Sequence, residues 1–208
     1  MLTDSLVVLD FETTGLHADH GDRITEVAAV RLCNGKVVDR YDSLINCGRR
    51  LSNSIRQFTG INQQMIDSAP LPCRVLPGLL FFIGSDPVVS HNAAFDQGFL
   101  DIECERMDLR RSGQDFICTV QLARRLVPDL PSHSLNALVR HFNLPNIGEH
   151  RAVPDVEATV QVLLRLCELA KDLTQNSEIT TNILRLLATG PLPDRYIEDL
   201  DSVSLRSA

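Results

Sequence analysis

The 208-residue sequence lacks the features that mark membrane and exported proteins. Its longest uninterrupted apolar stretch, Leu79–Ile83, is far shorter than the ~20 residues that a membrane-spanning helix needs. The first fifteen residues carry no basic segment, and their apolar run Leu6–Leu9 is too short for an export signal. We therefore expect a cytoplasmic protein with no membrane partner.

Paired cysteines and an excess of positive charge are also missing. The six cysteines form no C-x-x-C pair, which is typical of reduced thiols in a cytosolic protein. Acidic residues number 27 against 20 basic ones, so the formal net charge is −7. This balance argues against a protein that binds a long stretch of nucleic-acid backbone through clustered Lys and Arg. It does not exclude a protein that holds a few terminal nucleotides.

The remaining composition, 44% hydrophobic and 23% charged, is that of an ordinary globular domain. At ~150 residues per domain, the length predicts one domain over residues 1–173. A C-terminal helix and tail over residues 174–208 follow, and we expect this segment either to bind a partner or to be poorly ordered. The sequence contains no internal repeat and no low-complexity tract.

Hydrophobic patterning predicts strands that come first as a group and then alternate with helices. Two β-type runs joined at Asn34-Gly35 are typical of a hairpin, so the first three strands should be adjacent and antiparallel. An α/β fold with a mixed sheet and helices on both faces follows from this order. We expect strands at 6–11, 24–33, 37–45, 87–90 and 116–118, and helices at 54–58, 62–66, 73–84, 93–107, 119–126, 134–142, 153–173 and 179–188.

Two carboxylates, Asp10 and Glu12, emerge from the end of an otherwise apolar strand. The two-residue period of a strand places both on one face, while Phe11 faces the other way. Acidic pairs at this spacing are common by chance, so the apolar context is what distinguishes this one. Burying both carboxylates without partners would cost several kcal/mol, which indicates a cation or hydrogen-bond donors nearby.

Three motifs appear in order along the chain: DFETTGL at 10–16, SHNAAFDQGFL at 90–100 and HRAVPD at 150–155. Together, over about residues 5–172, they closely resemble the DEDDh family of 3′–5′ exonucleases, the DnaQ-like proofreading group of the ribonuclease-H-like superfamily. Two smaller segments, Thr59–Ile61 and Ser134–Leu138, match as well. The resemblance implies a ribonuclease-H-like fold with a five-stranded mixed sheet. Within the family, the sequence resembles the proofreading subunit of bacterial DNA polymerase III.

The resemblance also implies a set of catalytic residues. Asp10, Glu12, Asp96 and Asp155 would bind two divalent cations, Mg²⁺ or Mn²⁺, and His150 would act as general base. Phosphodiester hydrolysis needs an activated water and neutralisation of the attacking and leaving oxygens, which two such ions provide. Hard oxygen ligands suit these ions, and an imidazole pKa near 6.5 suits a base.

Recognition of a strand terminus is expected near these groups. Backbone N–H groups of Thr13, Thr14 and Gly15 would approach the terminal nucleotide, and Leu16 would wedge against its base. The resemblance adds Ile61 as a second apolar contact. His91 and Asn92 lie beside the site, although Asn92 is also a candidate helix N-cap.

The expected activity is therefore release of nucleoside 5′-monophosphates from a single-stranded 3′ end. DNA in proofreading or repair, RNA trimming, and a non-catalytic module that binds nucleic acid or polymerase subunits remain open at this point. The D-x-D-x-T strand end of haloacid-dehalogenase phosphatases is a poorer match, because Glu12 stands at its third position. Such a phosphatase also needs a lysine between its nucleophile and a later acidic pair. Here Lys36 comes too early in the chain and Lys171 too late.

Overall fold

The computed structural model describes residues 2–111, 113–145 and 150–190. A single five-stranded sheet with the order β3-β2-β1-β4-β5 forms its centre. β1 pairs antiparallel with β2, β2 antiparallel with β3, and β1, β4 and β5 run parallel. The elements are β1 (Ser5–Thr13), η1 (Ala18–His20), β2 (Ile24–Cys33), β3 (Lys36–Leu44), α1 (Asn53–Thr59), α2 (Gln63–Asp67), α3 (Pro72–Ile83), β4 (Val88–Ser90), α4 (Ala93–Arg106), β5 (Phe116–Cys118), α5 (Thr119–Leu126), α6 (Leu135–His141), α7 (Ala152–Thr174) and α8 (Thr181–Thr189).

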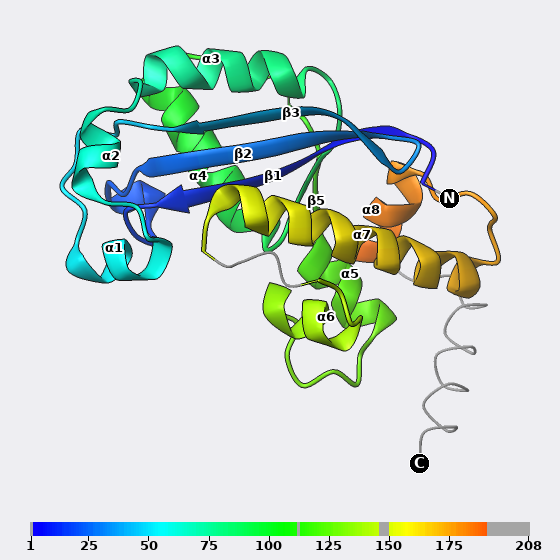
Figure 1. The fold of residues 1–208 in the computed structure, drawn as a ribbon. Coiled ribbons are helices and arrows are strands. Elements are labelled where there is room, and N and C mark those ends of the chain that lie inside the picture. The colour runs from blue at the N-terminus through cyan, green and yellow to red at the C-terminus, as the bar shows by residue number, and fades with distance from the viewer. Residues whose placement is uncertain (1, 112, 146–149, 191–208) are drawn as a thin grey trace.

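Helices cover both faces of this sheet (Figure 1). Leu6 and Val8 of β1 pack into a core shared with α5, α6, α7 and α8. Val7, Leu9 and Phe11 alternate with them and pack into a second core formed with α3 and α4. The mixed sheet between two helical layers confirms the predicted fold class.

The hairpin between β2 and β3 turns at Asn34 and Gly35, as predicted. Both residues have positive φ, 51° and 71° respectively. Two successive left-handed residues form the turn whose twist matches the twist of paired strands, and Asn-Gly is the pair that best tolerates it.

The helix that we expected in the segment after residue 173 packs against the rest of the fold. Ile179 pairs with Leu2 in an isolated parallel bridge, and the Thr181 N–H donates to Asp4 Oδ2 at 2.7 Å. Leu184 and Leu187 of α8 are buried in the same core as α7. The amphipathic face of α8 therefore completes the main core through residue 190. The rest of the expected tail, residues 191–208, lies outside the described part of the chain.

None of the described helices combines the length and the apolar character that crossing a bilayer requires.

Candidate active site

The strand alternation that buries Leu6 and Val8 continues to Asp10 and Glu12 at the carboxyl end of β1. Both carboxylates therefore project toward the face that α7 covers. Asp155, in the first turn of α7, meets them there. Ligand oxygens of Asp10, Glu12 and Asp155 all lie within 4.8 Å of one another. Residues 145 positions apart in the sequence thus form one acidic cluster.

Asp96 approaches the same strand end from α4. Its side chain is 1% exposed, and its Oδ1 accepts a hydrogen bond from the Phe11 N–H at 3.1 Å. The negative charge of Asp96 also contributes to the raised pKa of Asp10. The structure therefore brings together all four carboxylates that the three motifs contain.

The electrostatics of this cluster are unfavourable for four ionised groups. Desolvation raises the pKa of Asp10 well above its ordinary value, and the charges of Asp96, Asp155 and Glu12 raise it further. Burial, followed by the charges of Asp155 and Glu26, raises the pKa of Glu12 to about 8, while Arg151 opposes this shift. Burial raises the pKa of Asp96 as well. Such shifts are typical of functional sites.

Divalent cations fit this arrangement. The donors are carboxylate oxygens, which Mg²⁺ and Mn²⁺ prefer, and their ligand atoms already converge. Within the described residues, no salt bridge reaches Asp10, Glu12 or Asp96, so the protein itself leaves their charge largely uncompensated. Cations would supply the missing positive charge.

Glu26, which the motifs did not single out, holds the start of α7 against the sheet. It lies opposite Glu12 in the β1–β2 register. Arg151 binds both its carboxylate oxygens, with Nε–Oε2 at 2.9 Å and Nη2–Oε1 at 2.6 Å, and the Ala152 N–H donates to Oε2 at 3.0 Å. This clamp fixes the turn that carries Asp155. Glu26 is the single acid in the otherwise uncharged start of β2, and this isolated charge could have marked it in the sequence as a residue that needs a partner.

His150 lies directly before α7, and its backbone N–H donates to Asp155 Oδ2 at 3.1 Å. Its backbone has a positive φ of 60°, which is uncommon for a residue with a Cβ. Its ring stacks on Phe58 of α1, with ring centroids 3.7 Å apart and planes at 29°. Phe58 is 57% exposed in spite of this contact. The sequence offered no signal that these two residues would meet.

The loop that follows Glu12 is held by Asp22. The Asp22 carboxylate accepts from Thr14 Oγ1 at 2.9 Å and from the His17 N–H at 3.0 Å. A Cβ at Gly15 would collide with the Asp22 carboxylate, so a larger residue there would displace the side chain that holds the loop. The loop leaves Leu16 with 74% of its surface exposed.

Two expected substrate contacts are not available in this structure. The Thr14 N–H donates to the Arg23 carbonyl at 2.9 Å, because Thr14 prolongs the pairing of β1 with β2. Ile61 is fully buried in a small cluster with Cys47, Leu51 and Ile66, so it presents no surface to a base. Phe58 of α1, the helix that precedes Ile61, is exposed and could offer apolar surface to a base instead.

His91 and Asn92 follow β4, the parallel neighbour of β1. His91 Nδ1 lies 2.9 Å from Thr119 Oγ1. Asn92 occupies the N-cap position of α4, as expected, but its side chain makes no capping hydrogen bond because its backbone is left-handed, with φ 70°. Capping therefore does not occupy the Asn92 amide.

Comparison with known proteins decides the family. The sequence profile of the RNase T exonuclease family matches residues 7–163, which is most of the chain. The chain belongs to this family. This membership confirms the resemblance to DEDDh 3′–5′ exonucleases, a group whose members depend on metal ions.

Relatives of this exonuclease domain occur in large bacterial polymerases. It is 37% identical over 182 residues to the PolC-type DNA polymerase III of Oceanobacillus iheyensis, and 36% identical over 183 residues to that of Bacillus subtilis. Each alignment covers 86% of this chain but only 13% of the polymerase. The exonuclease domain therefore matches a small part of those proteins.

Solved exonuclease structures share its fold. Exonuclease X in complex with 5′-overhanging duplex DNA superposes with a TM-score of 0.68 at 27% identity, covering 88% of this chain and 99% of that one. Escherichia coli exonuclease I in complex with a dT13 oligonucleotide gives a TM-score of 0.72 at 16% identity, covering 83% of this chain and 43% of that one. The second likeness concerns the fold alone.

Proposed function

We propose that this chain is a 3′–5′ exonuclease that releases nucleoside 5′-monophosphates from the 3′ end of single-stranded DNA. The convergence of Asp10, Glu12, Asp96 and Asp155 on one strand end is the observation that carries this proposal. The four carboxylates would hold two divalent cations, Mg²⁺ or Mn²⁺. When bound, the ions supply charge neutralisation at the scissile phosphate and acidify a water.

The other side chains of the site have separate roles in this proposal. His150 would accept the proton of the attacking water as a general base. Its loop is set by the hydrogen bond to Asp155 and by the stacking on Phe58. The Glu26–Arg151 pair acts through α7, because it orients Asp155 without touching the substrate.

The terminal nucleotide is held by the loop after β1 and by the segment after β4. Leu16 and Phe58 offer exposed apolar surface to its base, which can contribute ~1–3 kcal/mol per stacked base. Thr13, Thr14 and Gly15 shape the loop, and the Thr13 hydroxyl donates to the Gly15 carbonyl. His91 and Asn92 border the other side of the site.

Proofreading is the role that the relatives favour, because the PolC-type polymerases share this segment. We therefore propose association with DNA polymerase subunits in the cytoplasm. The C-terminal segment after residue 173 is the proposed place for such a partner, with exposed Leu186 on α8 as one available apolar contact.

The test of this function is hydrolysis of a 5′-labelled single-stranded DNA oligonucleotide with Mg²⁺ or Mn²⁺. Asp10→Asn should lower the rate by at least ~10³-fold, because it removes a charge where the cations bind. Asp39→Asn, an exposed carboxylate on β3, is the matched control and should retain full activity.

Two results would contradict the proposal. Equal inactivity of the wild type and Asp10→Asn would favour a non-catalytic binding module. A faster rate on a matched RNA oligonucleotide than on DNA would favour RNA trimming. Copurification with polymerase subunits tests the proposed partner separately.

A further inference from the structure

Two histidines and an aspartate lie together on the turn that follows the β1 loop, outside the acidic cluster. His17 stands directly before η1, and Asp19 and His20 belong to it. One ligand atom from each of the three side chains lies within 4.8 Å of the other two, and all three residues are exposed. The exonuclease function proposed above uses none of them.

The 3₁₀ turn explains why the two imidazoles meet. A 3₁₀-helix has three residues per turn, so side chains at positions i and i+3 lie one above the other. His17 and His20 have this spacing, and their ring centroids are 5.3 Å apart with planes at 34°. Asp19 lies beside them, with its Oδ2 3.6 Å from His20 Nε2. The chain therefore presents two imidazoles and a carboxylate to the same volume of solvent.

The backbone of this turn is fixed by the rest of the fold. Ala18, between the two histidines, is buried in the core that α4 shares with the sheet. Its carbonyl accepts from Arg106 Nη2 at 2.9 Å. On the other side, the His17 N–H donates to Asp22 Oδ2 at 3.0 Å. Because the backbone is already held, an ion bound here has to order only exposed side chains and not the loop itself.

The distances within the group suit a tetrahedral zinc ion. Zinc binds imidazole nitrogen at ~2.0–2.1 Å and carboxylate oxygen at ~2.0–2.2 Å, so its neighbouring ligand atoms are roughly 3.4 Å apart. The Asp19–His20 pair is close to that spacing. Two imidazoles on one tetrahedral zinc have centroids about 5.2 Å apart, near the 5.3 Å between His17 and His20. Three protein ligands and one water complete the coordination.

The donor atoms distinguish this group from the acidic cluster. Imidazole nitrogen suits Zn²⁺, whereas Mg²⁺ and Mn²⁺ prefer hard oxygen ligands. The cluster of Asp10, Glu12 and Asp155 offers oxygen atoms only. The two groups therefore favour different cations.

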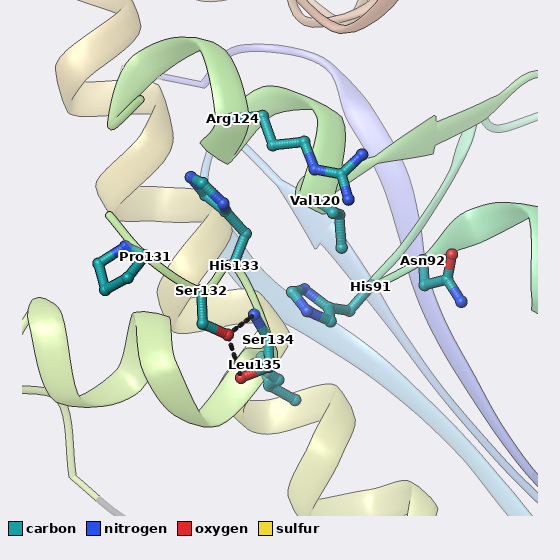
Figure 2. Close-up of a pocket in the computed structure, with 9 residues that line it drawn as sticks. All are labelled: His91, Asn92, Val120, Arg124, Pro131, Ser132, His133, Ser134 and Leu135. Carbon is teal, nitrogen blue, oxygen red and sulfur yellow. Dashed lines mark hydrogen bonds between the residues drawn. The ribbon is translucent and has the colours of Figure 1, made fainter. Parts of the chain in front are cut away.

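A second pair of histidines in the chain is arranged differently. Figure 2 shows His91 and His133 in the wall of a pocket that has no carboxylate among its described lining residues. His91 Nδ1 lies 2.9 Å from Thr119 Oγ1, and His133 Nε2 lies 3.0 Å from the Val127 carbonyl oxygen, so both rings have protein partners. Within the described part of the chain, no hydrogen bond reaches a ring nitrogen of the histidine pair at η1.

We propose that His17, Asp19 and His20 bind one zinc ion, separate from the catalytic cations proposed for the acidic cluster. Because His17 directly follows the exposed Leu16, the ion lies at the end of the loop that presents this apolar side chain. The proposal stands on the geometry and the donor atoms of the turn, and it goes beyond the exonuclease function without depending on it.

The experiment measures the zinc affinity of the untagged full chain by competition with a chromophoric chelator. Asp10→Asn is the background, because it weakens cation binding at the acidic cluster. We expect this variant to bind a zinc ion that excess Mg²⁺ does not displace. Adding His17→Ala or His20→Ala should lower the zinc affinity at least ~100-fold, because even residues that only orient metal ligands account for ~10–100-fold. Adding Asp19→Asn should lower it at least ~10-fold.

A control variant and a second readout exclude general effects of the substitutions. His141→Ala, which removes an exposed histidine at the end of α6, should leave the zinc affinity unchanged. In EDTA, all variants should melt at the temperature of the Asp10→Asn background, since the substituted side chains are exposed. Zinc should raise the melting temperature only where both His17 and His20 are present.

The outcomes separate this site from the exonuclease function. A zinc affinity that is unchanged by His17→Ala and His20→Ala would refute the site. Displacement of the zinc by Mg²⁺ would also refute it, because oxygen ligands would then account for the binding. A chain that hydrolyses DNA but binds no zinc at this turn refutes the zinc site alone. A chain that binds zinc through these histidines but does not hydrolyse nucleic acid refutes the exonuclease function alone.

Discussion

Two groups of buried carboxylates in this domain differ in whether arginine side chains neutralise their charge. Glu103 of α4 is 1% exposed and is bound by Arg23 and Arg106, with Nη2–Oε2 of Arg23 at 2.9 Å and Nη1–Oε1 of Arg106 at 2.9 Å. Asp96, two helical turns earlier on the same helix, is equally buried but faces other carboxylates. One helix thus carries both a compensated and an uncompensated acid.

This difference in charge compensation indicates a different role for each cluster. The Arg23–Glu103–Arg106 cluster ties the β1–β2 loop region to α4, because Arg106 also donates to the Ala18 carbonyl at 2.9 Å. It is complete within the protein and serves stability. Asp10, Glu12 and Asp96 form no salt bridge within the described residues, so the protein alone bears a cost that the proposed cations would remove.

The largest effect on stability should come from breaking the compensated cluster. Glu103→Gln leaves Arg23 and Arg106 without their shared counter-charge and should lower the free energy of unfolding by about 3 kcal/mol. Urea denaturation measures this loss. Glu105→Gln, an exposed acid on the same helix, is the control and should change stability by less than ~0.5 kcal/mol. Equal effects of the two substitutions would refute the assigned role of Glu103.

The uncompensated cluster should instead make the metal-free protein less stable as pH rises. The folded-state pKa of Glu12 is about 8 against an ordinary 4.5, so the folded chain retains a proton that the unfolded chain releases. This contribution is fully present below pH 4.5 and is lost as pH rises through about 8. Between pH 5 and pH 8.5 in EDTA, we therefore expect the free energy of unfolding to fall by a few kcal/mol. Glu12→Gln should flatten that part of the pH profile, and an unchanged profile would contradict the shift.

Cation binding should produce the smallest of the three effects. Mg²⁺ or Mn²⁺ at ten times its dissociation constant should stabilise the folded state by ~1.4 kcal/mol, measured as a rise in melting temperature at pH 8. Asp10→Asn should lose most of this rise while melting no lower than the wild type in EDTA, because one repelling charge is gone. Glu103→Gln should keep the rise. A metal response that survives in Asp10→Asn would place the cations elsewhere.

The local pattern of apolar and polar residues was sufficient to predict much of the fold and the face on which two of the acids lie. The alternation of apolar residues along 6–12 already set Asp10 and Glu12 on one face, and Asn34-Gly35 already required the β2–β3 turn. The helix at Ala152–Thr174 was predicted within one residue at each end. These features depend on neighbours a few residues away, so short-range periodicity determines them.

Other features depended on residues that are far apart in the sequence. The Ile61 side chain was expected at the substrate but is buried, because α1 and α2 fold over the end of β3 and enclose it. The packing of α8 on the main core and the pairing of Ile179 with Leu2 were likewise not predicted. Neither outcome follows from the local character of those residues.

By itself, the sequence therefore identified the side chains that we propose to carry the chemistry: four carboxylates and a histidine in three motifs of the DEDDh type. Only the tertiary structure decided how they are held. Glu26 and Arg151, 125 residues apart, form the clamp on α7, and Phe58 supplies the ring under His150. A periodic pattern specifies which face of an element is buried, but the partner on that face is set by packing between elements.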